Sequence, residues 1–204
     1  MLDFLQGPEF TVNVSPLSSL RKALFLVALA SGLCVSQLRA LTRYLQWTTF
    51  AMDRSAVSLA SSPRFLAKNE REDHLLQPVV IPAWMDGRFH HSLCPVQALE
   101  SYLSSSPSQE LRHLFRFPDS ARPLSVRQIA ATLKDVIDLA DPGHLPRAHD
   151  IRGVAASLAF LRTHSLNQVR QGGQWSTASA FVSRYLHPSV VDAPCVALGV
   201  RPNQ

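Results

Sequence analysis

The hydrophobic positions of the chain change their period twice along its length. Within 20–28, leucine, valine and alanine recur at three- and four-residue intervals, which places them on one face of a helix. Ser15 followed by Pro16 is typical of a helix start, and Gly32 is placed to end that helix. We therefore predict a long helix from Pro16 to just before Gly32, and a second, shorter helix over about 36–45.

The middle of the chain, over 48–82, follows a different pattern. Val57 and Leu59 alternate with small polar residues, and a charged NERED turn at 69–73 separates them from the apolar QPVVIP at 77–82. Alternation with a period of two is typical of half-buried strands, and a polar turn joins such strands into a hairpin. This segment predicts short strands in a small antiparallel sheet.

Helical spacing returns after Pro95 and continues through the C-terminal third. Ser125 and Gln128 form a capping-box pattern ahead of an apolar helical series, which Asp-Pro-Gly at 141–143 ends. Further helices are predicted over about 149–162, 165–171 and 177–186. The predicted order is thus helices, then a small sheet, then helices again. This order predicts a mainly helical α+β domain.

The amino-acid composition excludes only a few classes of function. The chain has 204 residues, 46% apolar and 17% charged, which is the profile of a globular domain. Its net charge of +5 is compatible with a nucleic-acid partner, but many ordinary proteins share such a surplus. The most apolar stretch, 23–30, is far shorter than the ~20 residues of a membrane span, so no membrane association is expected.

The cysteines and histidines give no pattern for a metal or a disulfide framework. Cys34, Cys94 and Cys195 are widely spaced and odd in number, which favours a reducing compartment. His90 and His91 have only Cys94 near them, and this predicts a polar hairpin turn rather than a metal site. No phosphate-loop pattern occurs either, so we expect no cofactor.

Four residues of the C-terminal third form a pattern that none of them forms alone. His149 and Arg152 are three apart and so share a helix face, Trp175 follows in GGQW, and Tyr185 comes ten residues later. Taken singly, each has a simpler explanation as a helix cap, a solvated charge, a packing anchor or a half-buried amphipathic side chain. Their joint order, H-x-x-R, tryptophan, tyrosine, resembles the box-II-to-nucleophile region of tyrosine recombinases.

The resemblance extends upstream and covers about 16–188. LFLVALASGLCVSQLRALT at 24–42 resembles the family's helix-turn-helix around its first arginine, and Lys68 lies where the family has a lysine on a β-turn. The resemblance implies the tyrosine-recombinase catalytic-domain fold over 16–188, with 1–15 as a lead-in segment and 189–204 as a C-terminal tail. Phrases such as SLASSPRFLAKNE look like recombinases of DIRS-, Ngaro- or Crypton-type mobile elements, which implies a nuclear location.

The resemblance also implies a reaction and a role for each residue. Tyr185 would attack a DNA phosphodiester and form a 3′-phosphotyrosine, while Arg152 would clamp the phosphate oxygens. His149 would take part in proton transfer, Trp175 would donate a hydrogen bond to the phosphate, and Lys68 would protonate the leaving 5′-oxygen. No metal or nucleotide is needed, because the covalent intermediate keeps the bond energy. The implied partner is double-stranded DNA, held by a homo-tetramer in active members.

The chain departs from the family pattern at its first arginine. Cys34 occupies that position, and Gln37 occupies the position of the family's glutamate. A thiol offers one weak donor and no positive charge, and Arg39, five residues on, should not project where residue 34 does. We therefore predict strongly impaired strand cleavage; rescue by an arginine from another element stays open. Only about fifteen residues precede the domain where the family usually has a DNA-clamping domain, so the expected grip on DNA is weak and salt-sensitive.

Two functions of different classes remain open. One is a DNA strand-transferase of a mobile element that breaks and rejoins DNA through Tyr185. The other is a catalytically inactive, co-opted DNA-binding or assembly module that keeps the fold, and a gene fragment under little constraint would look similar. A hydrolase built on Ser/His/Asp has no support beyond the abundance of serine.

Overall fold

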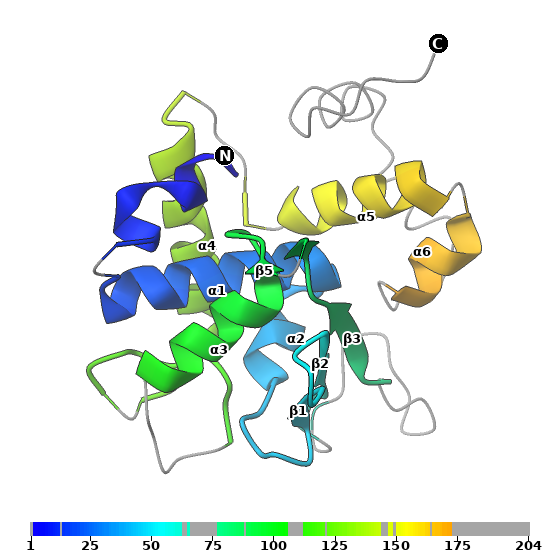
Figure 1. Ribbon diagram of the computed structural model, residues 1–204, viewed down its shortest axis with the longest axis horizontal. Helices are drawn as coiled ribbons and strands as arrows, with labels where there is room; N and C mark the ends of the chain where they lie inside the picture. The colour runs from blue at the N-terminus through cyan, green and yellow to red at the C-terminus, as the bar shows by residue number, and fades with distance from the viewer. Residues whose placement is uncertain are drawn as a thin grey trace.

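The computed structural model describes residues 2–12, 14–62, 65, 77–87, 89–105, 112–120, 122–143, 147–148, 150–163 and 165–172. The helices are η1 (Phe4–Gln6), η2 (Pro8–Phe10), α1 (Pro16–Ser31), α2 (Val35–Ala40), α3 (Pro95–Ser105), α4 (Val126–Ala140), α5 (Asp150–Thr163) and α6 (Leu166–Gly172). The strands are β1 (Thr48–Phe50), β2 (Ala56–Leu59), β3 (Val79–Pro82), β4 (Met85–Asp86) and β5 (Phe89–His90). Figure 1 shows their arrangement.

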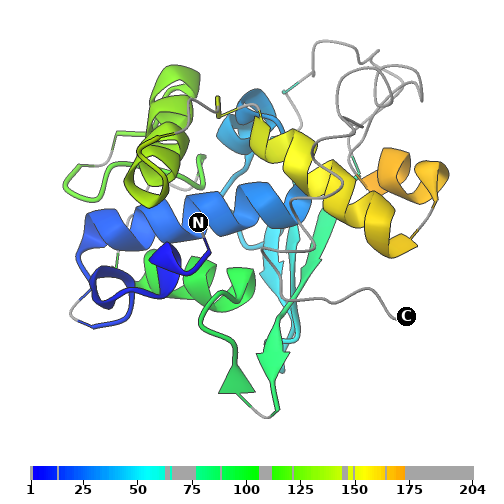
Figure 2. The same cartoon turned by 90° about the horizontal axis from the view of Figure 1, so that it is seen from above.

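Helix α1 runs through the middle of the molecule. It packs against α3 on one side and against α4 and α5 on the other, as both views show (Figures 1 and 2). Leu24 and Val27 on this helix are completely buried. The predicted start is confirmed, because the Ser15 side chain accepts a hydrogen bond from the Ser18 amide. The predicted end is confirmed too: Gly32 has a φ of 63°, in the left-handed region that favours glycine.

Helix α2 is shorter than the sequence predicts, and the predicted range of about 36–45 is wrong at its C-terminal end. The helix stops at Ala40 because the next backbone groups bond elsewhere. Leu41 forms an isolated bridge with Ser61, and its carbonyl accepts a hydrogen bond from the Leu114 amide. These partners are distant in sequence, so the local periodicity carries no sign of them.

The predicted antiparallel sheet is present, in the order β1-β2-β3. Val57 on β2 lies opposite Ile81 on β3, and both are completely buried, whereas Ser58 between buried positions is only half-buried. The alternation seen in the sequence is thus the alternation between the two faces of a sheet. A hairpin is present near the two histidines, but they do not form its turn as predicted: β4 pairs with β5 around Gly87, and His90 lies in β5.

The C-terminal helices lie within a residue or so of their predicted bounds. Helix α4 begins with the predicted capping box, in which the Ser125 side chain accepts from the Gln128 amide and Gln128 Oε1 accepts from the Ser125 amide. Helices α5 and α6 follow where the spacing places them. The helix predicted over 177–186 lies outside the described residues.

The lead-in segment packs into the domain core. Leu5 is completely buried and Phe10 is 3% exposed. The ring of Phe4 packs edge-on against Phe10, with 5.2 Å between centroids. The Phe10 carbonyl accepts a hydrogen bond from Lys22 Nζ on α1 at 3.2 Å. Helices of three residues are too short to show a hydrophobic period, so the sequence gives no sign of this packing.

The expected fold class, mainly helical α+β with a small antiparallel sheet, is confirmed. One continuous core joins the lead-in, the sheet and α1 to α5. Among the helices in the described part of the chain, none is both long and apolar enough to cross a membrane.

The Ser125 cap gives a first testable prediction. The substitution Ser125→Ala should lower the free energy of unfolding by about 1 kcal/mol, because the Gln128 amide loses its acceptor at the helix start. Urea unfolding measures the change. Ser104→Ala is the matched control, since the exposed Ser104 hydroxyl donates to the Glu100 carbonyl of its own helix and caps no helix start. Equal stability of the Ser125→Ala protein and the unsubstituted protein would contradict the prediction.

Candidate functional site

Cys34, which the resemblance aligns with the family's first arginine, lies at the start of α2. The left-handed Gly32 turns the chain between α1 and α2, and Cys34 becomes the N-cap residue with extended backbone angles of −78° and 163°. The amide of Cys34 donates to Gln37 Oε1 at 2.9 Å, and its Sγ lies 3.0 Å from Ser36 Oγ. The thiol is partly exposed, whereas Gln37 is only 3% exposed.

Arg152 reaches the same glutamine from the first turn of α5. Its Nη1 donates to Gln37 Oε1 across 3.4 Å, although the two residues are 115 positions apart in the sequence. Helix α5 is fixed there by the buried Ile151 and by close approach to the α1–α2 turn. A Cβ placed on Gly32 would lie 3.9 Å from the Ala155 Cβ, in ordinary contact.

One oxygen atom therefore joins the two positions that the resemblance assigns to the phosphate clamp. Gln37 Oε1 accepts both from the backbone amide of Cys34 and from the guanidinium of Arg152. The structure thus places residue 34 and Arg152 at one site, at the meeting point of α2 and α5. It tests neither the role of Arg152 nor the loss of an arginine at position 34.

The other predicted site residues are not placed. Lys68, His149, Trp175 and Tyr185 lie outside the described residues, so their convergence with Arg152 stays a prediction.

The sequence reasoning treated Gln37 as a departure from a family glutamate that supports the arginine or the local fold, and it missed the contact with Arg152. The structure shows Gln37 as the buried link between α2 and α5. A signal was available, because a residue three positions after a helix N-cap often returns its side chain to the N-cap amide when it is glutamine or glutamate.

The two arginines nearest to Cys34 in the sequence lie in and just after α2. Arg39 lies in the last turn of α2, at the opposite end of that helix from Cys34. Arg43 Nη2 donates to the Leu103 carbonyl on α3 at 3.2 Å. The Arg43 side chain is thus directed to α3 in this contact, and Arg39 starts from the other end of α2.

The chemistry of this site suits an anion better than a metal. A guanidinium presents planar donors that bind phosphate oxygens in pairs. Gln37 is neutral, so its contact with Arg152 does not offset the positive charge, as a carboxylate would. Within the described ranges, no group of three or more histidine, cysteine, aspartate or glutamate side chains is arranged to hold a metal ion.

Comparisons with known proteins give matches in structure but not in sequence. No family model matches the chain, and neither does any curated protein. The XerH site-specific recombinase in a post-cleavage complex with palindromic difH substrate matches with a TM-score of 0.63 and 13% identity, over 97% of this chain and 51% of that one. The XerA recombinase matches with a TM-score of 0.56 and 14% identity, over 91% and 62%.

A transposon enzyme is similar as well. The Tn1549 transposon integrase in complex with transposon right-end DNA has a TM-score of 0.56 and 11% identity, over 98% of this chain and 64% of that one. The chain therefore spans between half and about two thirds of the length of these proteins. Low identity combined with near-complete coverage establishes a shared fold. The chain has the tyrosine-recombinase catalytic-domain fold.

Proposed function

We propose that this chain is a DNA-binding tyrosine-recombinase domain whose strand cleavage is impaired because residue 34 is a cysteine. The observation that carries the proposal is the convergence of Cys34 and Arg152 on Gln37 Oε1. The resemblance assigns these two positions to one phosphate; their contacts with the same oxygen support that assignment, and only one of them bears a guanidinium.

The physical reason for impairment is the charge of the transition state. Attack on a phosphodiester concentrates negative charge on the non-bridging oxygens, and fixed donors stabilise it more than they stabilise the ground state. Loss of one such donor typically costs about 10²–10³ in rate. A thiol does not replace the guanidinium, because it is neutral and a weak donor.

DNA is the partner that the fold and the charge support. The similar XerH and Tn1549 proteins are described in complexes with DNA, and this chain carries a net charge of +5. We extend the proposal to an origin in a DIRS-, Ngaro- or Crypton-type mobile element, a nuclear location, and tetrameric assembly on double-stranded DNA if cleavage is restored. Those extensions rest on the sequence resemblance alone.

The test is covalent capture. The full chain is incubated with a pool of nicked duplexes of random sequence, whose cleavage releases a short strand and traps any phosphotyrosine adduct. We expect the natural sequence to bind the duplexes and to form little or no adduct. Efficient adduct formation that disappears in Tyr185→Phe would show that cleavage is intact and would overturn the impairment.

A non-catalytic DNA-binding or assembly module is the second candidate function. The contact of Arg152 with the neutral amide of Gln37 favours it, because a guanidinium attracts phosphate whether or not cleavage occurs. This candidate predicts that no substitution at position 34 restores an adduct, while DNA binding persists at low salt.

The contribution of Arg152 to DNA binding is separately measurable. The substitution Arg152→Ala should weaken binding and make the slope of log affinity against log salt shallower by about 1, since one phosphate contact is lost. Fluorescence anisotropy of a labelled duplex over a salt series measures both. Arg54→Ala is the matched control, because Arg54 already pairs with Glu100 across 3.0 Å. An unchanged slope in Arg152→Ala would contradict the placement of Arg152 at a phosphate.

A further inference from the structure

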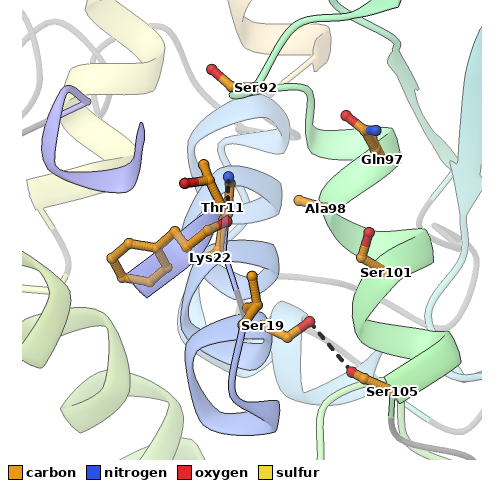
Figure 3. Close-up of a pocket in the computed structure, with 10 residues that line it drawn as sticks. Thr11, Ser19, Lys22, Ser92, Gln97, Ala98, Ser101 and Ser105 are labelled. Carbon is orange, nitrogen blue, oxygen red and sulfur yellow. Dashed lines mark hydrogen bonds between the residues drawn. The ribbon is translucent and has the colours of Figure 1, made fainter. Parts of the chain in front are cut away.

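A pocket of about 340 Å³ with a mixed polar and apolar lining lies between the lead-in segment, α1 and α3 (Figure 3). The lead-in contributes Phe10, Thr11 and Val14 to its wall. Helix α1 contributes Ser19 and Lys22, and the chain from Ser92 into α3 contributes the rest: Ser92, Gln97, Ala98, Ser101 and Ser105. Gln97, Ser101 and Ser105 are four residues apart, so one face of α3 forms this wall.

Polar side chains lie beside apolar ones in the lining. Five of the ten lining residues carry hydroxyl groups, and Lys22 carries the single positive charge among the ten. Two polar contacts already cross the pocket floor: Lys22 Nζ donates to the Phe10 carbonyl at 3.2 Å, and Ser105 Oγ donates to Ser19 Oγ at 3.4 Å. Among the lining residues that the structure describes there is no aspartate or glutamate.

The pocket is separate from the Arg152 site. Helix α3 lies on one side of α1, and α5 lies on the other (Figure 2). A duplex bound at Arg152 would thus meet a different face of α1 from a molecule in the pocket. The occupant of the pocket is consequently argued from its own lining and size.

We propose that this pocket binds a small polar molecule through an anionic group, a phosphate or a carboxylate, held by Lys22 and the surrounding hydroxyls. An ammonium group has three donors, and only one of them is used by the Phe10 carbonyl in the hydrogen bond given above. The volume falls at the lower end of the range of ligand pockets, about 300–1,000 Å³, which suits a molecule of the size of a sugar phosphate or a sugar acid.

An anionic occupant would change the environment of Lys22. Burial lowers the pKa of Lys22 below its ordinary value, because the charged form is partly removed from water. A bound anion would oppose this shift and favour the charged ammonium. Occupancy would also tie the lead-in to α1 and α3, since all three contribute to the wall.

The experiment measures the unfolding temperature of the full chain against ligand concentration. The probes are inorganic phosphate, glucose 6-phosphate, gluconate and, as the neutral comparison, glucose. We expect a saturable rise in Tm of about 3–6 °C at ten times Kd for at least one anionic probe, and no rise for glucose. Phosphate-bearing and carboxylate-bearing probes distinguish the two sources of the anionic group.

Two variants and one control locate the effect. Lys22→Gln removes the charge, and Ser101→Leu fills the pocket from an exposed position on α3. Both should abolish the rise. Lys134→Gln should keep it, because Lys134 lies on α4 and pairs with Asp138. The proposal is overturned if no anionic probe raises Tm, if glucose raises it equally, or if the rise survives in Ser101→Leu.

Discussion

Replacing Cys34 with arginine is expected to raise the rate of covalent protein–DNA adduct formation by about 10²–10³-fold. The substitution restores a guanidinium at the start of α2, next to the oxygen that already receives Arg152. Two planar cations would then face one phosphate. Cys34 is partly exposed, so the longer side chain has access to solvent and to DNA. Gel analysis of the nicked-duplex reaction at several times measures the rate.

We expect the size of this increase in the adduct-formation rate to depend on Gln37, which is neutral. Two guanidiniums beside one buried amide repel each other, and a carboxylate there would hold both in place. We therefore expect Cys34→Arg combined with Gln37→Glu to exceed Cys34→Arg alone, and Gln37→Glu alone to give no adduct. Such coupling between neighbours is what a double-mutant cycle measures.

Other substitutions at position 34 distinguish the effect of a positive charge from the effect of the planar guanidinium. Cys34→Lys supplies the charge without the planar fork, so its gain should be smaller than that of Cys34→Arg. Cys34→Ala should give none. If Cys34→Arg binds the duplexes but forms no adduct in either background, residue 34 does not limit cleavage, and the non-catalytic module becomes the better account.

The substitution Leu38→Ala should lower the free energy of unfolding by about 2–5 kcal/mol. Leu38 is 1% exposed and belongs to the core, and α2, which carries it, packs against α4. A helix of six residues is too short to be stable by itself, so its packing holds it in place. Loss of this side chain therefore also loosens the element that carries Cys34 and Gln37.

Urea unfolding of the full chain measures the Leu38→Ala effect, and Leu45→Ala is the matched control. Leu45 is 86% exposed, so the same truncation there should change the free energy of unfolding by no more than about 0.5 kcal/mol. Equal losses in the two variants would mean that α2 does not depend on its buried face.

Helix ends were predictable wherever a local signal marks them. Ser15 with Pro16, Gly32, and the Ser125–Gln128 pair all act within four residues of the helix terminus, and the structure confirms each. The end of α2 was not predictable, because the carbonyl of Leu41 bonds to Leu114. Such a partner is chosen by the tertiary fold, which a hydrophobic period does not encode.

The candidate functional site, like the helix ends, could be predicted only in part. The order of residues from His149 to Tyr185 predicted the fold that the structure has, and the alignment of position 34 placed Cys34 beside Arg152. Gln37 Oε1 connects the two residues. This connection depends on the contact between α2 and α5, which the sequence alone does not reveal. The expected roles of Lys68, His149, Trp175 and Tyr185 remain predictions, which the capture experiments above address.

The burial of Leu5 and Phe10 has a practical consequence for how the protein is handled and fused. An expression boundary drawn at Pro16, where the recombinase resemblance begins, would remove both side chains and leave part of the surface of α1 uncovered. A protein or tag attached ahead of Leu2 would be joined through a packed segment instead of a free tether. Its orientation would therefore follow that of α1, which makes this end suitable for rigid fusions and unsuitable for flexible ones.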